Sequence, residues 1–186
     1  MYSFTHCKEP SCPRYTTSLS AYCLLHEPSQ DYISTLSEPA FDSVSLSNLV
    51  LRDSDLTQKM ITGSLFSYST FRNVSFNKTT MLNSNFSFCL FEKCTFDLSS
   101  IRYVILSGST FIECTFLNSS ITHTNLSGCV FTHSDFTGSD LYYTSFANSH
   151  FTDTKIEDCN LRKATFLNTV QTNLSFRWSN YKEAQQ

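Results

Sequence analysis

Every fifth residue from Leu36 to Phe166 is a large apolar side chain, in 27 consecutive positions without an exception. Fourteen of these residues are Phe, eight are Leu, four are Ile and one is Met. A period of five matches neither an α-helix, whose faces repeat about every 3.6 residues, nor a flat strand, whose faces repeat about every two. It is the period of a chain that turns a corner every five residues and directs one large side chain inward from each facet.

The residue two places before each large residue is usually small. Among the 26 such positions that precede Phe41 to Phe166, ten are Ser, five Cys, four Thr, three Val and one Ala. Small and large side chains therefore alternate inward with one outward residue between them, as the pleat of a strand requires. All four glycines stand two places after a large residue, where a type II turn needs positive φ. The repeating unit is small, polar, large, polar, turn.

Large residues twenty places apart share their character. The series from Ile61 to Leu161 contains no Phe, whereas the series from Phe71 to Phe151 contains nothing else. This second period indicates four facets per coil, with each side chain stacked on its counterpart in the next coil. With parallel strands about 4.8 Å apart, the repeat corresponds to about seven coils and a rod roughly 30 Å long.

Segments such as Ser134-Asp135-Phe136-Thr137-Gly138 closely match a known consensus, Ala-Asp/Asn-Leu-x-x. The chain thus resembles the pentapeptide repeat family over roughly three quarters of its length. The resemblance implies an all-β fold: a right-handed four-sided parallel β-helix, or solenoid, here of about seven coils. The chain departs from the consensus by using Ser or Cys far more often than Ala.

Three larger residues, Pro39, Leu49 and Lys59, occupy small positions near the start of the repeat. Burial of an unpaired lysine is costly. We therefore expect the facet near Lys59 to be distorted, or its side chain to reach solvent.

The eight cysteines form two groups. Five of them occupy the small inward position, where a free cysteine acts as a small buried apolar residue: Cys89, Cys94, Cys114, Cys129 and Cys159. The other three precede the repeat in the arrangement Cys-x4-Cys-x10-Cys-x2-His, formed by Cys7, Cys12, Cys23 and His26.

The N-terminal spacing resembles small Cys3His zinc knuckles. Tetrahedral zinc needs four soft or borderline donors, and two closely spaced pairs supply them. We predict a structural zinc site with Cys7, Cys12, Cys23 and His26 as ligands, in which metal binding supplies the folding energy of a segment too short for a core. The alternative is a loosely ordered, reduced leader with incidental cysteines, and His6 is a competing donor.

The expected organisation has three parts. Residues 1–30 form a small zinc-binding cap on the first coil, whose bare strand edges would otherwise invite aggregation. Residues 31–181 form the β-helix, with Phe176, Trp178 and Tyr181 covering the last coil. Residues 182–186 form a frayed tail.

The register places several apolar residues outside. One group gathers around one corner on neighbouring coils: Leu82, Tyr103, Ile105, His123, Tyr142 and Tyr143. A second group lies near the next corner: Leu65, Tyr68, Phe88 and Leu90. Because clustered exposed apolar residues mark binding surfaces, we predict that the first group binds a protein partner.

The family resemblance offers an alternative function, since well-known members mimic B-form DNA and bind DNA gyrase. Duplex DNA carries one negative charge per roughly 1.7 Å, so a rod of about 30 Å would need on the order of 18 net negative charges. Residues 36–186 contain thirteen Asp and Glu against eleven Lys and Arg, a net charge of −2. The charge therefore disfavours a DNA-mimic regulator and favours a non-enzymatic protein-binding scaffold.

Other function classes find little support. Lys8 and Arg14 are the only basic residues before Arg52, too few for phosphate tracking. The sequence has no apolar run of transmembrane length and no signal-peptide pattern at its start, so we expect a cytoplasmic protein, monomeric or homodimeric. A convex rod also lacks the cleft that a substrate or a catalytic histidine, such as His123, His133 or His150, would require.

Overall fold

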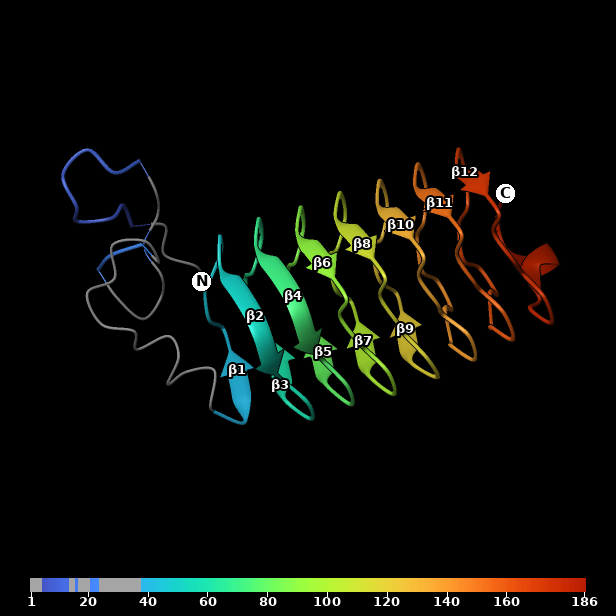
Figure 1. The fold of residues 1–186 in the computed structure, drawn as a ribbon, viewed down its shortest axis with the longest axis horizontal. Helices are drawn as coiled ribbons and strands as arrows, with labels where there is room; N and C mark the ends of the chain where they lie inside the picture. Colours follow the sequence, from blue (N-terminus) through green and yellow to red (C-terminus); the bar gives the residue numbers. More distant parts are fainter. Residues whose placement is uncertain (1–4, 14–15, 17–20, 24–37) are drawn as a thin grey trace.

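The computed structural model describes residues 5–13, 16, 21–23 and 38–186 of the chain. From Ala40 onward the chain winds into coils that stack side by side along one long axis (Figure 1). The named elements of this rod are short: β1 (Ala40–Asp42), β2 (Val50–Asp55), β3 (Met60–Thr62), β4 (Thr70–Ser75), β5 (Thr80–Leu82), β6 (Leu90–Glu92), β7 (Ser100–Arg102), β8 (Thr110–Ile112), β9 (Ser120–Thr122), β10 (Val130–Thr132), β11 (His150–Thr152), β12 (Val170–Thr172) and the 3-10 helix η1 (Tyr181–Glu183).

All strand pairs are parallel, and each residue pairs with the residue twenty places further on. One sheet has the order β1-β3-β5-β7-β9, and the other has the order β12-β11-β10-β8-β6-β4-β2. The remaining facets carry isolated parallel bridges with the same offset, for example Thr95 with Thr115. The all-β parallel solenoid of about seven coils that the sequence predicts is confirmed.

The large residues fill the interior of the rod. All 26 of them from Phe41 to Phe166 are buried, whereas Leu36 lies outside the described residues. Phenylalanines twenty places apart stack face to face, with ring centroids 4.8 Å apart for Phe91 and Phe111 and 4.4 Å for Phe116 and Phe136. Adjacent stacks meet edge to face, as Phe111 and Phe116 do at 5.6 Å. Such pairs add about 0.5–1.5 kcal/mol each beyond the burial of their area.

The small inward residues link one coil to the next, which explains why Ser and Cys replace Ala. The Ser119 hydroxyl donates to the carbonyl of Phe96, 2.6 Å away in the preceding coil, and accepts the amide N–H of Ser99 at 3.2 Å. The Cys129 thiol likewise donates to the carbonyl of Leu106 at 3.2 Å. Because a hydrogen bond contributes a net of about 0.5–1.5 kcal/mol, these side chains stabilise the stacking of the coils.

The corners have one backbone conformation throughout. Every fifth residue from Ser43 to Trp178 has positive φ, whatever its side chain. Twenty-four of these positions are not glycine, and they include Phe88, Leu98 and Glu113. The corner positions form four lines along the rod, each with a spacing of twenty residues. We call them corner A (Ser43 to Lys163), corner B (Asn48 to Asn168), corner C (Asp53 to Asn173) and corner D (Gln58 to Trp178). Corners A and C are diagonally opposite because two facets separate them.

The ends of the rod differ in detail from the sequence-based expectation. Lys59 is half-buried: its Nζ lies 5.9 Å from the centroid of the Phe41 ring and donates to the carbonyl of Glu38 at 2.6 Å. At the other end Phe176 and Tyr181 stack with centroids 3.9 Å apart and pack against the core. Trp178, which we expected to help cover the last coil, is instead 74% exposed because it occupies an outward corner position.

The last residues take part in the coil. We expected a frayed tail from Lys182 to Gln186, but Lys182 and Glu183 lie in η1. Gln185 forms a parallel bridge with Thr165, in which the amide of Phe166 donates to the Gln185 carbonyl at 2.7 Å. This pairing satisfies backbone groups that the edge of the last coil would otherwise leave to solvent.

No helix in the described part of the chain is long and apolar enough to cross a membrane.

Candidate functional site

The three N-terminal cysteines lie together. The Sγ atoms of Cys7, Cys12 and Cys23 are all within 4.8 Å of one another, and Cys7 and Cys23 are buried. Local hydrogen bonds shape the segment: the amide of Cys12 donates to the Glu9 carbonyl at 3.1 Å, across a turn in which Ser11 has a φ of 68°. The sequence therefore brings together three cysteines that are separated by up to sixteen residues.

The geometry of the cysteine cluster suits a metal ion. The Sγ atoms of Cys12 and Cys23 are 3.8 Å apart, which is close to the separation of about 3.8 Å expected for two thiolates that each lie about 2.3 Å from zinc in a tetrahedron. The amide of Cys23 donates to the Cys7 sulfur at 3.3 Å, and such a bond favours the thiolate. These three cysteines could bind a metal. His26, the predicted fourth ligand, lies outside the described residues.

The predicted partner surface contains an exposed aromatic ladder on corner A. The rings of Tyr103 and His123 are 5.1 Å apart, and those of His123 and Tyr143 are 5.2 Å apart with an interplanar angle of 17°. Tyr142 meets the Tyr143 ring edge to face at 4.7 Å. Tyr103 is 49% exposed and Tyr143 is 45% exposed. The twenty-residue register thus places Tyr103, His123 and Tyr143 in contact on three successive coils, and the neighbouring Tyr142 adds a fourth ring beside Tyr143.

The other two predicted residues flank this ladder. Ile105 is 42% exposed on the neighbouring facet and pairs with Asn85 and Asn125. Leu82 ends β5, one coil before the first ring, and is half-buried. Leu82 therefore lies at the edge of this surface and not at its centre.

Three cations that the sequence reasoning did not assign to this surface border the ladder. The Arg102 guanidinium lies 5.7 Å from the Tyr103 ring centroid, and that of Arg162 lies 5.1 Å from the Tyr142 centroid. Lys163 Nζ is 5.0 Å from the Tyr143 centroid and donates to the Tyr143 hydroxyl at 2.9 Å. The twenty-residue period could have indicated two of these cations, since Arg162 follows Tyr142 and Lys163 follows Tyr143 by twenty residues.

The second apolar group also forms a stack, but a shorter one, on corner B. The Tyr68 and Phe88 rings are 5.2 Å apart with an interplanar angle of 10°. The stack ends at Gly108, where an added Cβ would meet the Phe88 ring at 2.5 Å. No cation borders these two rings among the described residues, which distinguishes corner B from corner A.

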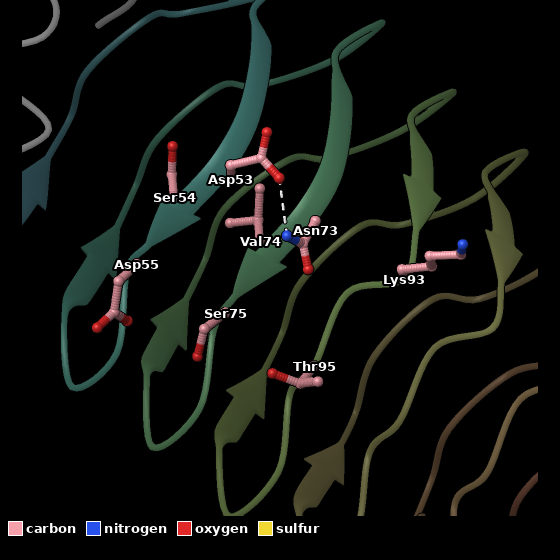
Figure 2. Close-up of a pocket in the computed structure, with 8 residues that line it drawn as sticks. All are labelled: Asp53, Ser54, Asp55, Asn73, Val74, Ser75, Lys93 and Thr95. Atoms are coloured by element: carbon pink, nitrogen blue, oxygen red, sulfur yellow. Dashed lines mark hydrogen bonds between the residues drawn. The ribbon is translucent and has the colours of Figure 1, made fainter.

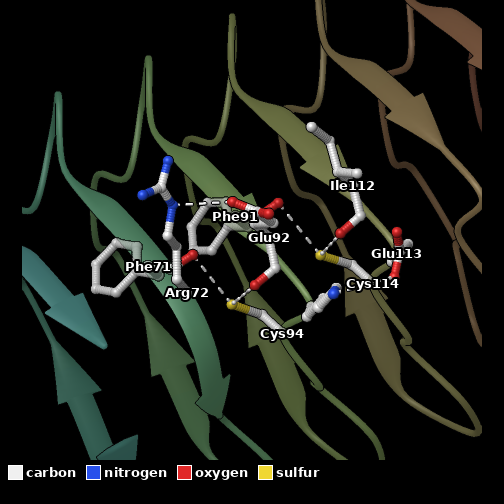
Figure 3. A network of polar contacts seen from close by, with 9 residues as sticks. Phe71, Arg72, Phe91, Glu92, Cys94, Ile112, Glu113 and Cys114 are labelled. Atoms are coloured by element: carbon white, nitrogen blue, oxygen red, sulfur yellow. Dashed lines mark hydrogen bonds and ion pairs between the residues drawn. The ribbon is translucent and has the colours of Figure 1, made fainter. Parts of the chain in front are cut away.

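The five cysteines of the rod are structural, as the register predicts. Figure 3 shows Cys94 and Cys114 donating to the carbonyls of Phe71 and Phe91, with distances of 3.4 and 3.5 Å. Burial raises the pKa of Cys89 to about 12 and that of Cys159 to about 11. Neutral buried thiols are poor nucleophiles and poor ligands.

Corner C carries a groove of about 290 Å³ that runs across β2, β4 and the next coil and is lined mostly by polar residues (Figure 2). Asn73 donates to Asp53 at 2.7 Å, and the hydroxyl and the amide of Thr57 lower the pKa of Asp55. Lys93 borders the groove and forms an ion pair with Glu113 at 4.0 Å. These groups satisfy one another, so the groove is a feature of ladder pairing along this corner.

The comparisons with known proteins agree with the fold. The family model for pentapeptide repeats matches in eight copies, over residues 99–132, 118–153 and 129–166. Among curated proteins, no sequence matches the chain.

Two solved structures match most of this chain at low identity and with TM-scores below 0.5. A trypsin-treated variant of QnrB1, a plasmid-mediated fluoroquinolone resistance protein, is 12% identical, with a TM-score of 0.46 over 77% of this chain and 92% of its own. HetL, a pentapeptide repeat protein involved in heterocyst differentiation regulation in the cyanobacterium Nostoc sp., is 13% identical, with a TM-score of 0.32 over 83% of this chain and 93% of its own.

These likenesses carry no argument about function. The residues that the family model matches have the same five-residue register and the same corner conformation as the coils before them. Residues 99–166 therefore carry pentapeptide repeats, and the chain from Ala40 onward is one parallel β-solenoid.

Proposed function

We propose that this protein is a non-enzymatic, cytoplasmic scaffold that binds another protein through corner A and carries a structural zinc site near its N-terminus. The observation that carries the proposal is the ladder of Tyr103, His123 and Tyr143, whose rings stack in contact while the two tyrosines remain almost half exposed. Contiguous exposed apolar and aromatic surface of this kind is typical of binding sites, and Tyr is enriched where proteins bind one another.

The architecture supports a binding role for the outer surface. The interior is filled by stacked rings such as Phe91, Phe111 and Phe131, each fully buried, so a partner is recognised from outside. The parallel pairing of successive coils holds the exposed rings at fixed spacings. A preorganised surface loses less conformational entropy on binding than a mobile one.

The experiment for this surface compares two pairs of substitutions. Immobilised wild-type protein, a Tyr103→Ser/Tyr143→Ser variant and a corner B control, Tyr68→Ser/Phe88→Ser, are each exposed to extract from the source organism. We expect a protein that the wild type and the control retain and the corner A variant loses. Retention profiles that do not differ between the three proteins would contradict the proposal.

The zinc site rests on the cluster of Cys7, Cys12 and Cys23, with His26 as the fourth ligand because it follows Cys23 at the spacing of a metal-binding pair. Four protein ligands leave no open coordination position, so zinc here stabilises the segment and performs no catalysis. Because the ligating thiols must be deprotonated, metal affinity falls with falling pH.

The first test of the zinc site is the metal content of untagged protein purified without chelator. We expect one zinc per chain and loss of that zinc in a Cys23→Ser/His26→Ala variant. A second readout is the number of thiols that react with a disulfide reagent at about pH 8. None should react in the zinc-loaded protein and three after chelation, since the five thiols of the rod are buried. Metal-free protein with three freely reactive thiols before chelation would refute the site.

A further inference from the structure

Corner A carries cations that form no ion pair within the part of the chain that the structure describes. Arg102, Arg162 and Lys163 lie over tyrosine rings, and among the described residues no carboxylate is within ion-pair distance of any of them. Two acidic residues lie on or next to these coils. Glu183 follows Lys163 by one coil, and its carbonyl accepts the Lys163 amide at 3.1 Å, but its carboxylate is in none of the ion pairs of the described residues. The Oδ1 of Asp140 accepts the Asn160 side chain at 2.8 Å and the Tyr142 amide at 3.2 Å.

Corner C, diagonally opposite, has the reverse arrangement. The four ion pairs among the described residues all lie at or next to it. Arg72 meets Glu92 at 2.8 Å, Lys93 meets Glu113 at 4.0 Å, and Lys155 meets Asp135 at 3.6 Å. The chain as a whole has a formal net charge of −3. Corner D also has cations outside these ion pairs, Lys78 and Arg177, but corner A combines such cations with the exposed aromatic ladder.

We propose that the partner of corner A is an extended acidic segment of another protein, with two carboxylates about four residues apart and apolar side chains between them. The inference rests on the proposed function and adds the chemistry of the partner. A guanidinium stacked on an aromatic ring keeps its N–H edges free to donate to a carboxylate. Arg102 and Arg162 thus act as two fixed anion receptors, one toward each end of the aromatic ladder.

The distance between the guanidinium groups of Arg102 and Arg162 sets the expected spacing of the two carboxylates in the partner. Arg102 and Arg162 occupy the same register position three coils apart, a separation of about 14 Å at about 4.8 Å per coil. An extended chain rises about 3.3 Å per residue, so acids about four residues apart reach both guanidinium groups. Between them the partner's apolar side chains contact the rings of Tyr103, His123 and Tyr143.

Nucleic acid fits this surface less well. Binding to single strands uses the free faces of aromatic rings for base stacking, but the faces of His123 are covered by Tyr103 and Tyr143. Three cations are also few for tracking a phosphate backbone. Anionic membranes attract clusters of about four to eight basic residues, more than corner A provides.

The test measures binding of fluorescein-labelled dodecapeptides by anisotropy at low salt. The probe peptide has two Glu residues four positions apart with Leu and Tyr between them. In a second peptide Gln replaces both Glu, and in a third the two Glu are adjacent. The protein variants are Arg102→Glu/Arg162→Glu and, as a control with the same change of net charge on corner D, Lys78→Glu/Arg177→Glu.

We expect the probe peptide to bind and the corner A variant to bind it about tenfold more weakly, since two favourable charge pairs become repulsive. The corner D control should retain the wild-type affinity, and added salt should weaken binding. Adjacent Glu residues should bind more weakly than the spaced pair.

Two outcomes would overturn the inference in distinguishable ways. Equal binding of the Glu and Gln peptides, abolished by Tyr103→Ser/Tyr143→Ser, would remove the acidic chemistry and leave corner A as a docking surface. Binding that is absent, or that both pairs of charge reversals weaken equally, would reject the acidic partner altogether. In that case the extract experiment above still decides separately whether corner A binds a protein.

Discussion

Two aromatic ladders in this protein have nearly the same geometry and opposite surroundings. Inside the rod, Phe91, Phe111 and Phe131 stack with centroids 4.8 and 4.9 Å apart and are fully buried. On corner A, His123 and Tyr143 stack at 5.2 Å with the tyrosine 45% exposed. Both spacings follow from the parallel pairing of coils about 4.8 Å apart.

The comparison shows that the backbone sets the spacing of the rings, whereas burial sets how much the rings contribute to stability. Any aromatic residue repeated at twenty-residue intervals stacks in this fold, because the coils place equivalent positions one above another. Burial of the inner ladder contributes favourably to the free energy of folding. The rings of the outer ladder and the cations beside them remain accessible at the surface. Stability and recognition can therefore be changed independently by choosing which ladder to alter.

The largest effect is expected for a charge in the inner ladder. Phe131→Asp should prevent folding, because it removes a buried ring from its stack and buries a carboxylate without a partner. Tyr143→Asp in the outer ladder should fold normally. Circular dichroism and urea denaturation distinguish the two proteins. A well-folded Phe131→Asp variant would contradict the stacked-coil description.

A smaller loss is expected from removing an inter-coil hydrogen bond. Ser119→Ala removes the hydroxyl that donates to the Phe96 carbonyl and accepts the Ser99 amide. Because that amide also donates to that carbonyl at 3.2 Å, both groups keep a partner, and the free energy of unfolding should fall by about 0.5–1.5 kcal/mol, the net contribution of a hydrogen bond. Ser54→Ala is the matched control, since the Ser54 hydroxyl donates only to the carbonyl of Arg52 two residues before it. Equal losses in urea denaturation would show that the links between coils contribute nothing specific.

A gain of stability is expected at a corner. Leu98 has a φ of 59° and is 57% exposed, and this left-handed conformation costs a residue other than Gly or Asn about 1–2 kcal/mol. Leu98→Asn should therefore raise the free energy of unfolding by about 0.5–1 kcal/mol. Leu167→Asn, at an exposed position outside the left-handed corners, should bring no gain. Thermal denaturation of both variants tests whether the strain is real.

The smallest effect on stability is expected at the border of the outer ladder. Arg102→Glu/Arg162→Glu should change the free energy of unfolding by no more than about 0.5 kcal/mol, because exposed cations contribute little to stability. The same variant should lose partner binding. If it lost stability to the extent of Ser119→Ala, corner A would be a structural element and the contrast between the two ladders would fail.

Several features of the site could be anticipated from residue order, and others could not. The period of twenty predicts that Tyr103, His123 and Tyr143 share one edge, and the structure places them in contact. The same reasoning placed Trp178 over the last coil, although the corner register directs it outward. It also missed Arg162 and Lys163: the twenty-residue spacing aligns them with Tyr142 and Tyr143, but the contacts depend on how these long side chains are oriented.

Residue order alone accounts for the coil, because a five-residue alternation of small and large side chains is buried by turning a corner at each repeat. It also separates the cysteines of the core from those of the N-terminal cluster. The division of the outer surface follows from the three-dimensional arrangement, in which cations pair with carboxylates on corner C and lie over tyrosine rings on corner A. The repeat specifies which residues are buried, whereas charge pairing depends on distances between side chains on different coils.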